Sequence, residues 1–190
     1  LRMINLPKAT ILFFTICSLV TQTALAQEVP RAVPAAQIEK ISTLVGTWKL
    51  KTEIFSPENQ EWREVGQDIV SYDVIMNGTG LREKPVKHVS GDALGVETTF
   101  SYDQYRQTFR LSVLDDAWGI MDIYEGGIAD NKLIATNIGK GTHFPTQDGA
   151  VMEFRLNIAL GGDTRITEIN LTTNSGETWS QFYRLTYNRQ

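Results

Sequence analysis

Along most of this chain, apolar residues recur at every second position in short runs that are separated by turn-forming residues. In residues 48–54 (WKLKTEI) and in residues 153–158 (EFRLNI), charged or polar side chains alternate with mostly apolar ones. A period of two is typical of β-strands that bury one face. Clusters of Gly, Asn, Asp and Ser between the runs accept the backbone angles of tight turns. The pattern predicts about ten short strands at regular spacing.

A different period marks the segment before the first strand. Ile38, Ile41 and Leu44 are spaced by three residues, which places them on one face of a short helix. Pro34 suits the helix start, because its missing N–H would be unpaired there, and Gly46 ends the helix. One short helix followed by strands alone predicts an all-β fold. We expect an antiparallel up-and-down barrel, because closure removes the exposed edges of a sheet.

Two residue pairs are expected to interrupt the strand pattern near the middle of the chain. Asp115-Asp116 is an adjacent acid pair, but successive strand residues point to opposite faces, so we interpret the pair as a turn. Trp118 then begins another alternating run, and we expect Gly126-Gly127 to break that strand.

The first 26 residues follow the pattern of an export signal. Two basic residues are their only charges, residues 9–20 (ATILFFTICSLV) are mostly apolar, and residues 24–26 (ALA) form a small-x-small cleavage site. The apolar run of about 12 residues is shorter than the ~20 that a membrane-spanning helix needs. We therefore predict a signal peptide over residues 1–26, cleavage before Gln27, and a periplasmic or secreted protein without stable membrane insertion.

Composition narrows the classes of function. Residues 27–35 contain two prolines and are interpreted as a linker, which leaves residues 36–190 as one barrel domain. The one cysteine, Cys17, lies within the predicted signal, so the mature chain carries no disulfide or thiol chemistry. Residues 1–26 hold two of the 18 Lys and Arg and none of the 22 Asp and Glu, so the mature net charge is about −6. An acidic chain without a basic run is not expected to bind nucleic acid.

Residues 44–49 (LVGTWK), where a short helix meets Gly-x-Trp at the first strand, resemble the entry to the calycin barrels, the lipocalins and their relatives. More closely, the chain resembles a family of bacterial exported proteins known as domain-of-unknown-function family 1579. The resemblance covers residues 36–190 and implies a lipocalin-like barrel with a cavity for a small ligand. Its further matching segments are residues 100–103 (FSYD), 114–116 (LDD), 124–127 (YEGG), 175–179 (SGETW) and 183–184 (YR).

The resemblance also implies a structural role for Trp48 as a plug at one end of the barrel. In lipocalins a late arginine packs over this tryptophan, and a cation–π contact of that kind contributes ~0.5–2 kcal/mol. Arg184 and Arg189 are the candidates in this chain.

Aromatic residues on amphipathic strands are the candidates for a binding site. Ligand pockets are mostly apolar with a few polar groups, and a barrel of this size can hold one small ligand. We assign ligand binding to Trp118, Tyr124, Trp179 and Tyr183. For each of them, simple filling of the core is the alternative.

Asp122 is the one weak candidate for a catalytic residue. It shares a strand face with Trp118 and Tyr124, so an inward orientation would place an acid of raised pKa in an aromatic pocket. The opposite face is also apolar, which leaves the orientation open. His88 and His143 lie far apart without further ligands at metal spacing. We expect no metal and no cofactor, although haem-binding barrels related by fold keep haem as an alternative.

Three interpretations of function follow. The first is an exported binding protein that holds a small apolar ligand in the barrel. The second is an enzyme on the same barrel, with Asp122 as the base and a tyrosine such as Tyr124 or Tyr183 as the acid. The third is a structural or interaction protein whose barrel is filled by its own side chains. An internal cavity discriminates the third from the first two.

Overall fold

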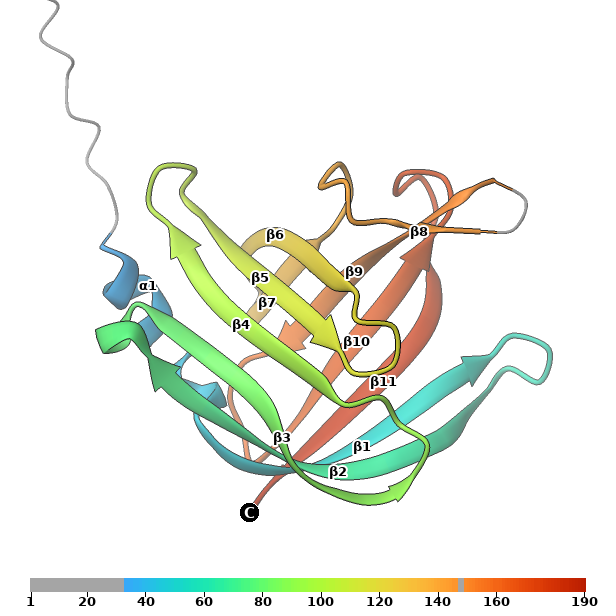
Figure 1. Cartoon of the computed structure of the whole chain (residues 1–190), viewed down its shortest axis with the longest axis horizontal. Helices are drawn as coiled ribbons and strands as arrows, with labels where there is room; N and C mark the ends of the chain where they lie inside the picture. The colour runs from blue at the N-terminus through green and yellow to red at the C-terminus, as the bar shows by residue number, and fades with distance from the viewer. Residues whose placement is uncertain (1–32, 147–148) are drawn as a thin grey trace, which may run out of the picture. The chain divides into compact units, whose positions relative to one another are not determined.

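The computed structural model describes residues 33–146 and 149–190, which are built mainly from strands (Figure 1). The predicted signal peptide over residues 1–26 lies outside the described residues, as does most of the predicted linker. In chain order the elements are α1 (Pro34–Glu39), η1 (Ser42–Leu44), β1 (Gly46–Ser56), β2 (Glu61–Ile75), η2 (Met76–Gly78), β3 (Gly80–Gly91), β4 (Val96–Asp103), β5 (Thr108–Asp115), β6 (Met121–Ala129), β7 (Lys132–Thr136), β8 (Phe144–Pro145), β9 (Val151–Ala159), β10 (Thr164–Thr172) and β11 (Ser180–Arg189).

Ten of these strands close into an antiparallel barrel. Each strand from β1 to β6 pairs with the next, β7 pairs with β9, and β9, β10 and β11 continue the ring until β11 meets β1 again. The short β8 pairs with β9 alone among the described strands. In β9 the predicted alternation holds, because Phe154, Leu156 and Ile158 are all buried. The prediction of an all-β, up-and-down barrel with a short N-terminal helix is confirmed.

The N-terminal helical segment closes one end of the barrel. α1 packs against β3 and β4, and Ile38, Ile41 and Leu44 are each at most 3% exposed. The predicted helix is interrupted, because α1 ends at Glu39 and a 3₁₀ turn, η1, follows it. Gly46 then adopts a φ of 128°, a value that side-chain-bearing residues rarely reach, and so turns the chain from η1 into β1.

Trp48 is the centre of this closed end. Its side chain is fully buried, and its Nε1–H donates a hydrogen bond to the Leu44 carbonyl at 2.8 Å. The Arg189 guanidinium lies over the ring, 4.1 Å from its centroid, so one of the two arginines predicted for this contact does form it. The other candidate is wrong: Arg184 lies over Trp62 instead. A second guanidinium near Trp48 comes from Arg165, at 4.8 Å.

The opposite end of the barrel is less regularly closed. β3 and β4 pair only from Gly80 opposite Ser101 to Glu83 opposite Thr98. Beyond Glu83, β3 continues to Gly91 paired with β2, while the chain turns back to enter β4 (Figure 1). Among the described strands, this half of β3 therefore has a partner on one side only. The wall of the barrel is interrupted there.

Gly126-Gly127 does not break a strand, contrary to the expectation from the sequence. Both glycines lie inside β6, which continues to Ala129, and the turn into β7 is formed by Asp130-Asn131. Gly126 is needed for close approach of β7, since a Cβ there would lie 1.8 Å from the Ile134 carbonyl oxygen. The glycine pair thus reflects tight strand pairing rather than a turn.

Candidate functional site

The barrel encloses a cavity of about 340 Å³ above the plugged end. Most of the residues around it are aliphatic or aromatic, with rings from β2, β4, β6, β9 and β11. Pockets that hold small organic molecules span ~300–1,000 Å³ and share this mostly apolar character. The barrel is therefore not filled by its own side chains, which weighs against the third interpretation.

Two loops form the rim of the cavity at the open end. Asp115 accepts hydrogen bonds from the backbone N–H groups of Ala117 and Trp118, at 2.9 and 2.6 Å. These backbone hydrogen bonds, Trp118 first, hold the pKa of Asp115 below its usual value. Asp116 accepts from the Gly95 N–H at 3.0 Å and so ties this loop to the one between β3 and β4. The adjacent acids build a turn, as the sequence predicted.

At the floor of the cavity lies a buried group of polar side chains. The Tyr187 hydroxyl donates to Glu83 Oε1 at 2.9 Å, and Tyr72 lines the floor beside them. Burial raises the pKa of Glu83, and the charge of nearby Arg165 opposes that rise only in part. The carboxyl group of Glu83 therefore keeps its proton to a higher pH than the carboxyl group of an exposed glutamate does.

Arg165 lies behind this floor. It is 2% exposed, and its guanidinium packs against the rings of Tyr187, Tyr72 and Trp48 at 3.7, 4.8 and 4.8 Å from their centroids. Among the described residues, none of its three guanidinium nitrogens has a hydrogen-bond partner. Its charge is stabilised by ring faces, and it acts as a structural cation between the plug and the cavity.

Asp122 points into the cavity wall and is 3% exposed, so its strand face is the inward one. Asn137 Nδ2 donates to its Oδ2 at 2.9 Å, and the Ile123 N–H donates to its Oδ1 at 2.9 Å. The Thr142 hydroxyl donates to Oδ1 as well. The Tyr124 hydroxyl is a further hydrogen-bond neighbour of the carboxyl group.

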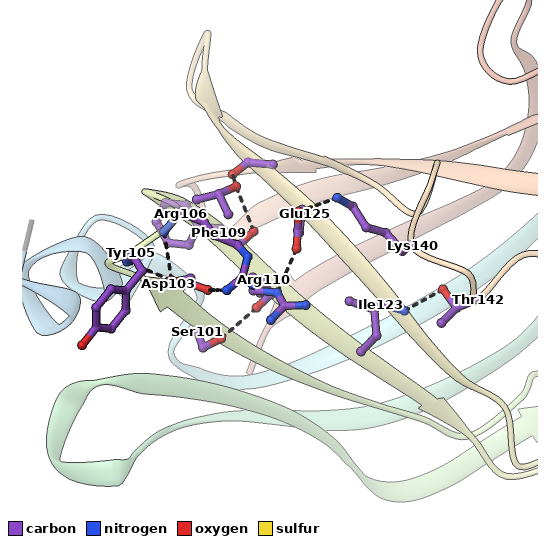
Figure 2. Close-up of polar contacts among 12 residues, drawn as sticks. Ser101, Asp103, Tyr105, Arg106, Phe109, Arg110, Ile123, Glu125, Lys140 and Thr142 are labelled. Carbon is purple, nitrogen blue, oxygen red and sulfur yellow. Dashed lines mark hydrogen bonds and ion pairs between the residues drawn. The ribbon is translucent and has the colours of Figure 1, made fainter. Parts of the chain in front are cut away.

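These contacts replace missing strand pairing. β7 ends at Thr136 and leaves the first half of β6 without a backbone partner on that side among the described strands. Asn137 spans the gap, since its Nδ2 reaches Asp122 and its Oδ1 accepts from the Phe154 N–H of β9 at 2.6 Å. The loop after β7 is also held to β6 by two contacts, Ile123 with Thr142 and Glu125 with Lys140 (Figure 2).

The chemistry of Asp122 follows from this arrangement. A carboxylate has about four lone-pair sites, and four donors surround this one. Burial raises the pKa of Asp122, and burial also raises the pKa of Tyr124, which stays a neutral donor. The acceptor sites of Asp122 are therefore occupied by donors of the protein itself and are not directed at a substrate proton. The geometry fits a structural carboxyl group better than a general base.

The structure brings together most of the residues predicted to bind a ligand. Trp118, Tyr124 and Tyr183 line the cavity. Trp118 stands at the rim and is 69% exposed. Trp179 does not line the cavity, because it lies under the Arg155 guanidinium, 4.4 Å from its ring centroid.

Sequence reasoning missed two acids of the cavity lining, Asp68 and Glu83. Asp68 lies on the same face of β2 as buried Val70 and Tyr72, and Glu83 lies on the same face of β3 as buried Leu81. An acid at an inward position of an alternating strand was the signal that could have identified them. His88 donates through Nδ1 to the carboxylate oxygen Oδ1 of Asp68 at 2.9 Å. The described residues contain no grouping of three His, Cys, Asp or Glu side chains suited to a metal ion.

The fold and the cavity define the class of the protein: a closed ten-stranded antiparallel barrel, plugged at one end, with an apolar cavity in its interior. Residues 33–189 match the family described as "Protein of unknown function (DUF1579)", and the chain belongs to that family. No curated protein matches the chain. Within the described residues, no helix is long and apolar enough to cross a membrane.

Proposed function

We propose that this protein binds one small, largely apolar molecule inside its barrel. The observation that carries the proposal is the cavity of about 340 Å³, which the barrel keeps open although its closed end is tightly packed. Apolar surface left in a cavity is a stability cost that natural cores usually avoid. A ligand that fills the cavity removes that cost and gives the aromatic lining a function.

The proposal includes export. The N-terminal pattern supports a signal peptide that ends at Ala26, and the acidic, cysteine-free remainder suits a periplasmic or secreted protein. N-terminal sequencing of protein recovered from its own host tests this part, with Gln27 as the expected first residue. Recovery of the uncut chain from the membrane fraction would contradict it.

Ligand binding is tested with a neutral fluorescent naphthylamine whose emission rises in apolar surroundings. Val113 lines the cavity, so Val113→Trp fills space and is expected to weaken probe binding at least tenfold, about 1.4 kcal/mol. The matched control is Val86→Trp, because Val86 is 57% exposed on β3 and does not line the cavity. Equal binding by the three proteins, or none by wild type, would contradict the proposal.

A second measurement looks for the natural ligand. Native mass spectrometry of protein purified from its own host is expected to show an added mass that disappears after extraction with organic solvent. The Val113→Trp protein prepared in the same way serves as the control, and it is expected to carry no such mass. The mass of the released molecule then gives its composition.

A further inference from the structure

Every Asp, Glu, Lys, Arg or His residue that lines the cavity is an acid. Glu83 lies at the floor, Asp122 in the wall, and the others towards the open end. No Lys, Arg or His of the described chain contributes to the lining. The acidic residues are Asp68, Glu83, Asp92, Asp115 and Asp122.

Most of these acids are already engaged. Asp115 caps its own turn, and Asp122 accepts hydrogen bonds from the strands and loop around it. Glu83 accepts from Tyr187 and has the Arg165 charge behind it. Their carboxyl groups hold the fold together and offer little to a ligand.

Asp68 differs from them. It is 6% exposed and lines the cavity, yet the one side chain that forms a hydrogen bond with it among the described residues is His88, on Oδ1. No described residue donates a hydrogen bond to Oδ2. This oxygen therefore keeps open acceptor sites in a largely buried carboxyl group, and a ligand in the cavity can supply a donor to it.

The surroundings of Asp68 suit an amphiphile. Asp68 lies in β2 opposite Leu50 of β1 and opposite His88 of β3, in the half of β3 that has no β4 partner among the described strands. Aromatic faces line the same cavity, and they attract cations as well as apolar groups. These rings include Tyr72, Phe100, Tyr124, Phe154, Phe182 and Tyr187.

We infer that the cavity selects a cationic amphiphile, an alkyl or aryl ammonium compound whose charged nitrogen lies at Asp68 Oδ2 and whose apolar body fills the aromatic interior. This inference rests on the proposed function and specifies its ligand class. An anionic amphiphile of the same size would bring its charge among carboxyl groups in an environment of low dielectric constant, where like charges repel strongly. A neutral alcohol fits the apolar interior but lacks the electrostatic attraction of a cation to the Asp68 carboxylate.

The test compares three decyl compounds of equal chain length: decylammonium, decanol and decanoate, each below the concentration at which it forms micelles. Displacement of the neutral naphthylamine probe gives their relative affinities. Wild type is expected to bind the cation at least about tenfold more tightly than the alcohol, and the alcohol more tightly than decanoate.

Two variants on the same strand separate a local contact from net charge. Asp68→Asn is expected to lower cation affinity about tenfold and to leave decanol binding unchanged. The control is Asp73→Asn, which changes the net charge equally, but Asp73 is exposed and pairs with Lys84 at 3.3 Å away from the cavity lining. It is expected to change cation affinity by less than about twofold.

Each outcome decides between the two proposals. If decanol and the probe bind but decanoate equals or exceeds the cation, the cavity binds apolar ligands and the charge selectivity is wrong. Equal losses in both Asn variants would likewise overturn the role of Asp68. If neither the probe nor any decyl compound binds wild type, the proposed function itself fails.

Discussion

Trp48 lies fully buried at the closed end, donates to Leu44, and is contacted by the guanidinium groups of Arg165 and Arg189. Truncation of a buried tryptophan leaves a cavity and costs ~3–5 kcal/mol. Because the stability of a whole domain is only ~5–15 kcal/mol, Trp48→Ala is expected to leave the barrel barely folded. Trp62 is only partly buried, so Trp62→Ala is expected to cost about 1 kcal/mol.

Urea melts of the two alanine variants check this prediction. The midpoint for Trp48→Ala is expected far below that of wild type, and the midpoint for Trp62→Ala close to it. Two small and equal shifts would show that Trp48 is not a structural plug.

Glu83 gives stability a pH dependence at the floor of the cavity. Burial raises its folded-state pKa above the ordinary value of 4.5. The protonated form is thus favoured by folding, and this contribution is complete below about pH 4.5 and lost as the pH rises through the folded-state pKa. A glutamine side chain at this position is neutral at every pH, so Glu83→Gln is expected to gain stability relative to wild type as the pH increases.

The measurement is the free energy of unfolding of wild type and Glu83→Gln in urea at pH 4 and at pH 8. The difference between the two proteins is expected to move in favour of the variant at pH 8. Glu58→Gln, in an exposed turn, serves as the control and is expected to show the same small difference at both values. A difference for Glu83→Gln that does not change with pH would mean that burial does not control this carboxyl group.

At the scale of the strands, alternation alone predicted which segments pair but not all of their faces. In β6 both faces carry apolar residues, and the inward orientation of Asp122 and Tyr124 emerged only from pairing with β5 and the Asn137 contact. Arg165 was missed because a charged residue in a strand is normally assigned to the outer face. Its burial depends on three rings from separate strands, which a local pattern does not bring together.

The glycine pair in β6 allows a matched test of strand packing. A Cβ on Gly126 would meet the Ile134 carbonyl of β7, whereas a Cβ on Gly127 would meet no heavy atom within 4 Å. Gly126→Ala is therefore expected to force β6 and β7 apart at a cost of ~1–3 kcal/mol or more. Gly127→Ala is expected to stay within about 0.5 kcal/mol of wild type.

Thermal unfolding of these neighbouring variants measures the difference, because the side-chain change is identical and only the surroundings differ. If both variants melt with wild type, β7 does not approach β6 as closely as the structure shows. If both lose stability alike, a general effect of a methyl group on β6 rather than the contact with Ile134 is responsible.

At the scale of the whole molecule, the sequence predicted the barrel but could not decide between a filled interior and a cavity. Strand number and turn chemistry are local properties, and they specify closure once about ten strands follow one another. The free volume depends on how side chains from all strands meet at the centre. Trp179 illustrates the limit, because its strand-like surroundings in the sequence match those of Tyr183, yet only Tyr183 lines the cavity.

The proposed ligand is expected to stabilise the barrel as one unit, since nine of the ten barrel strands contribute residues to the cavity lining. A molecule that binds only the folded state adds about 2.7 kcal/mol at a free concentration 100 times its Kd. For a domain of this size that gain corresponds to a rise in Tm of roughly 5–10 °C. Calorimetry with increasing decylammonium is expected to show a single transition whose Tm rises with the logarithm of concentration. The same titration of Val113→Trp is expected to raise Tm by about half as much or less, because an affinity at least tenfold lower gives about 1.4 kcal/mol or less at the same concentration. A rise of equal size in both proteins would indicate that the compound acts on the surface of the barrel and not in its interior.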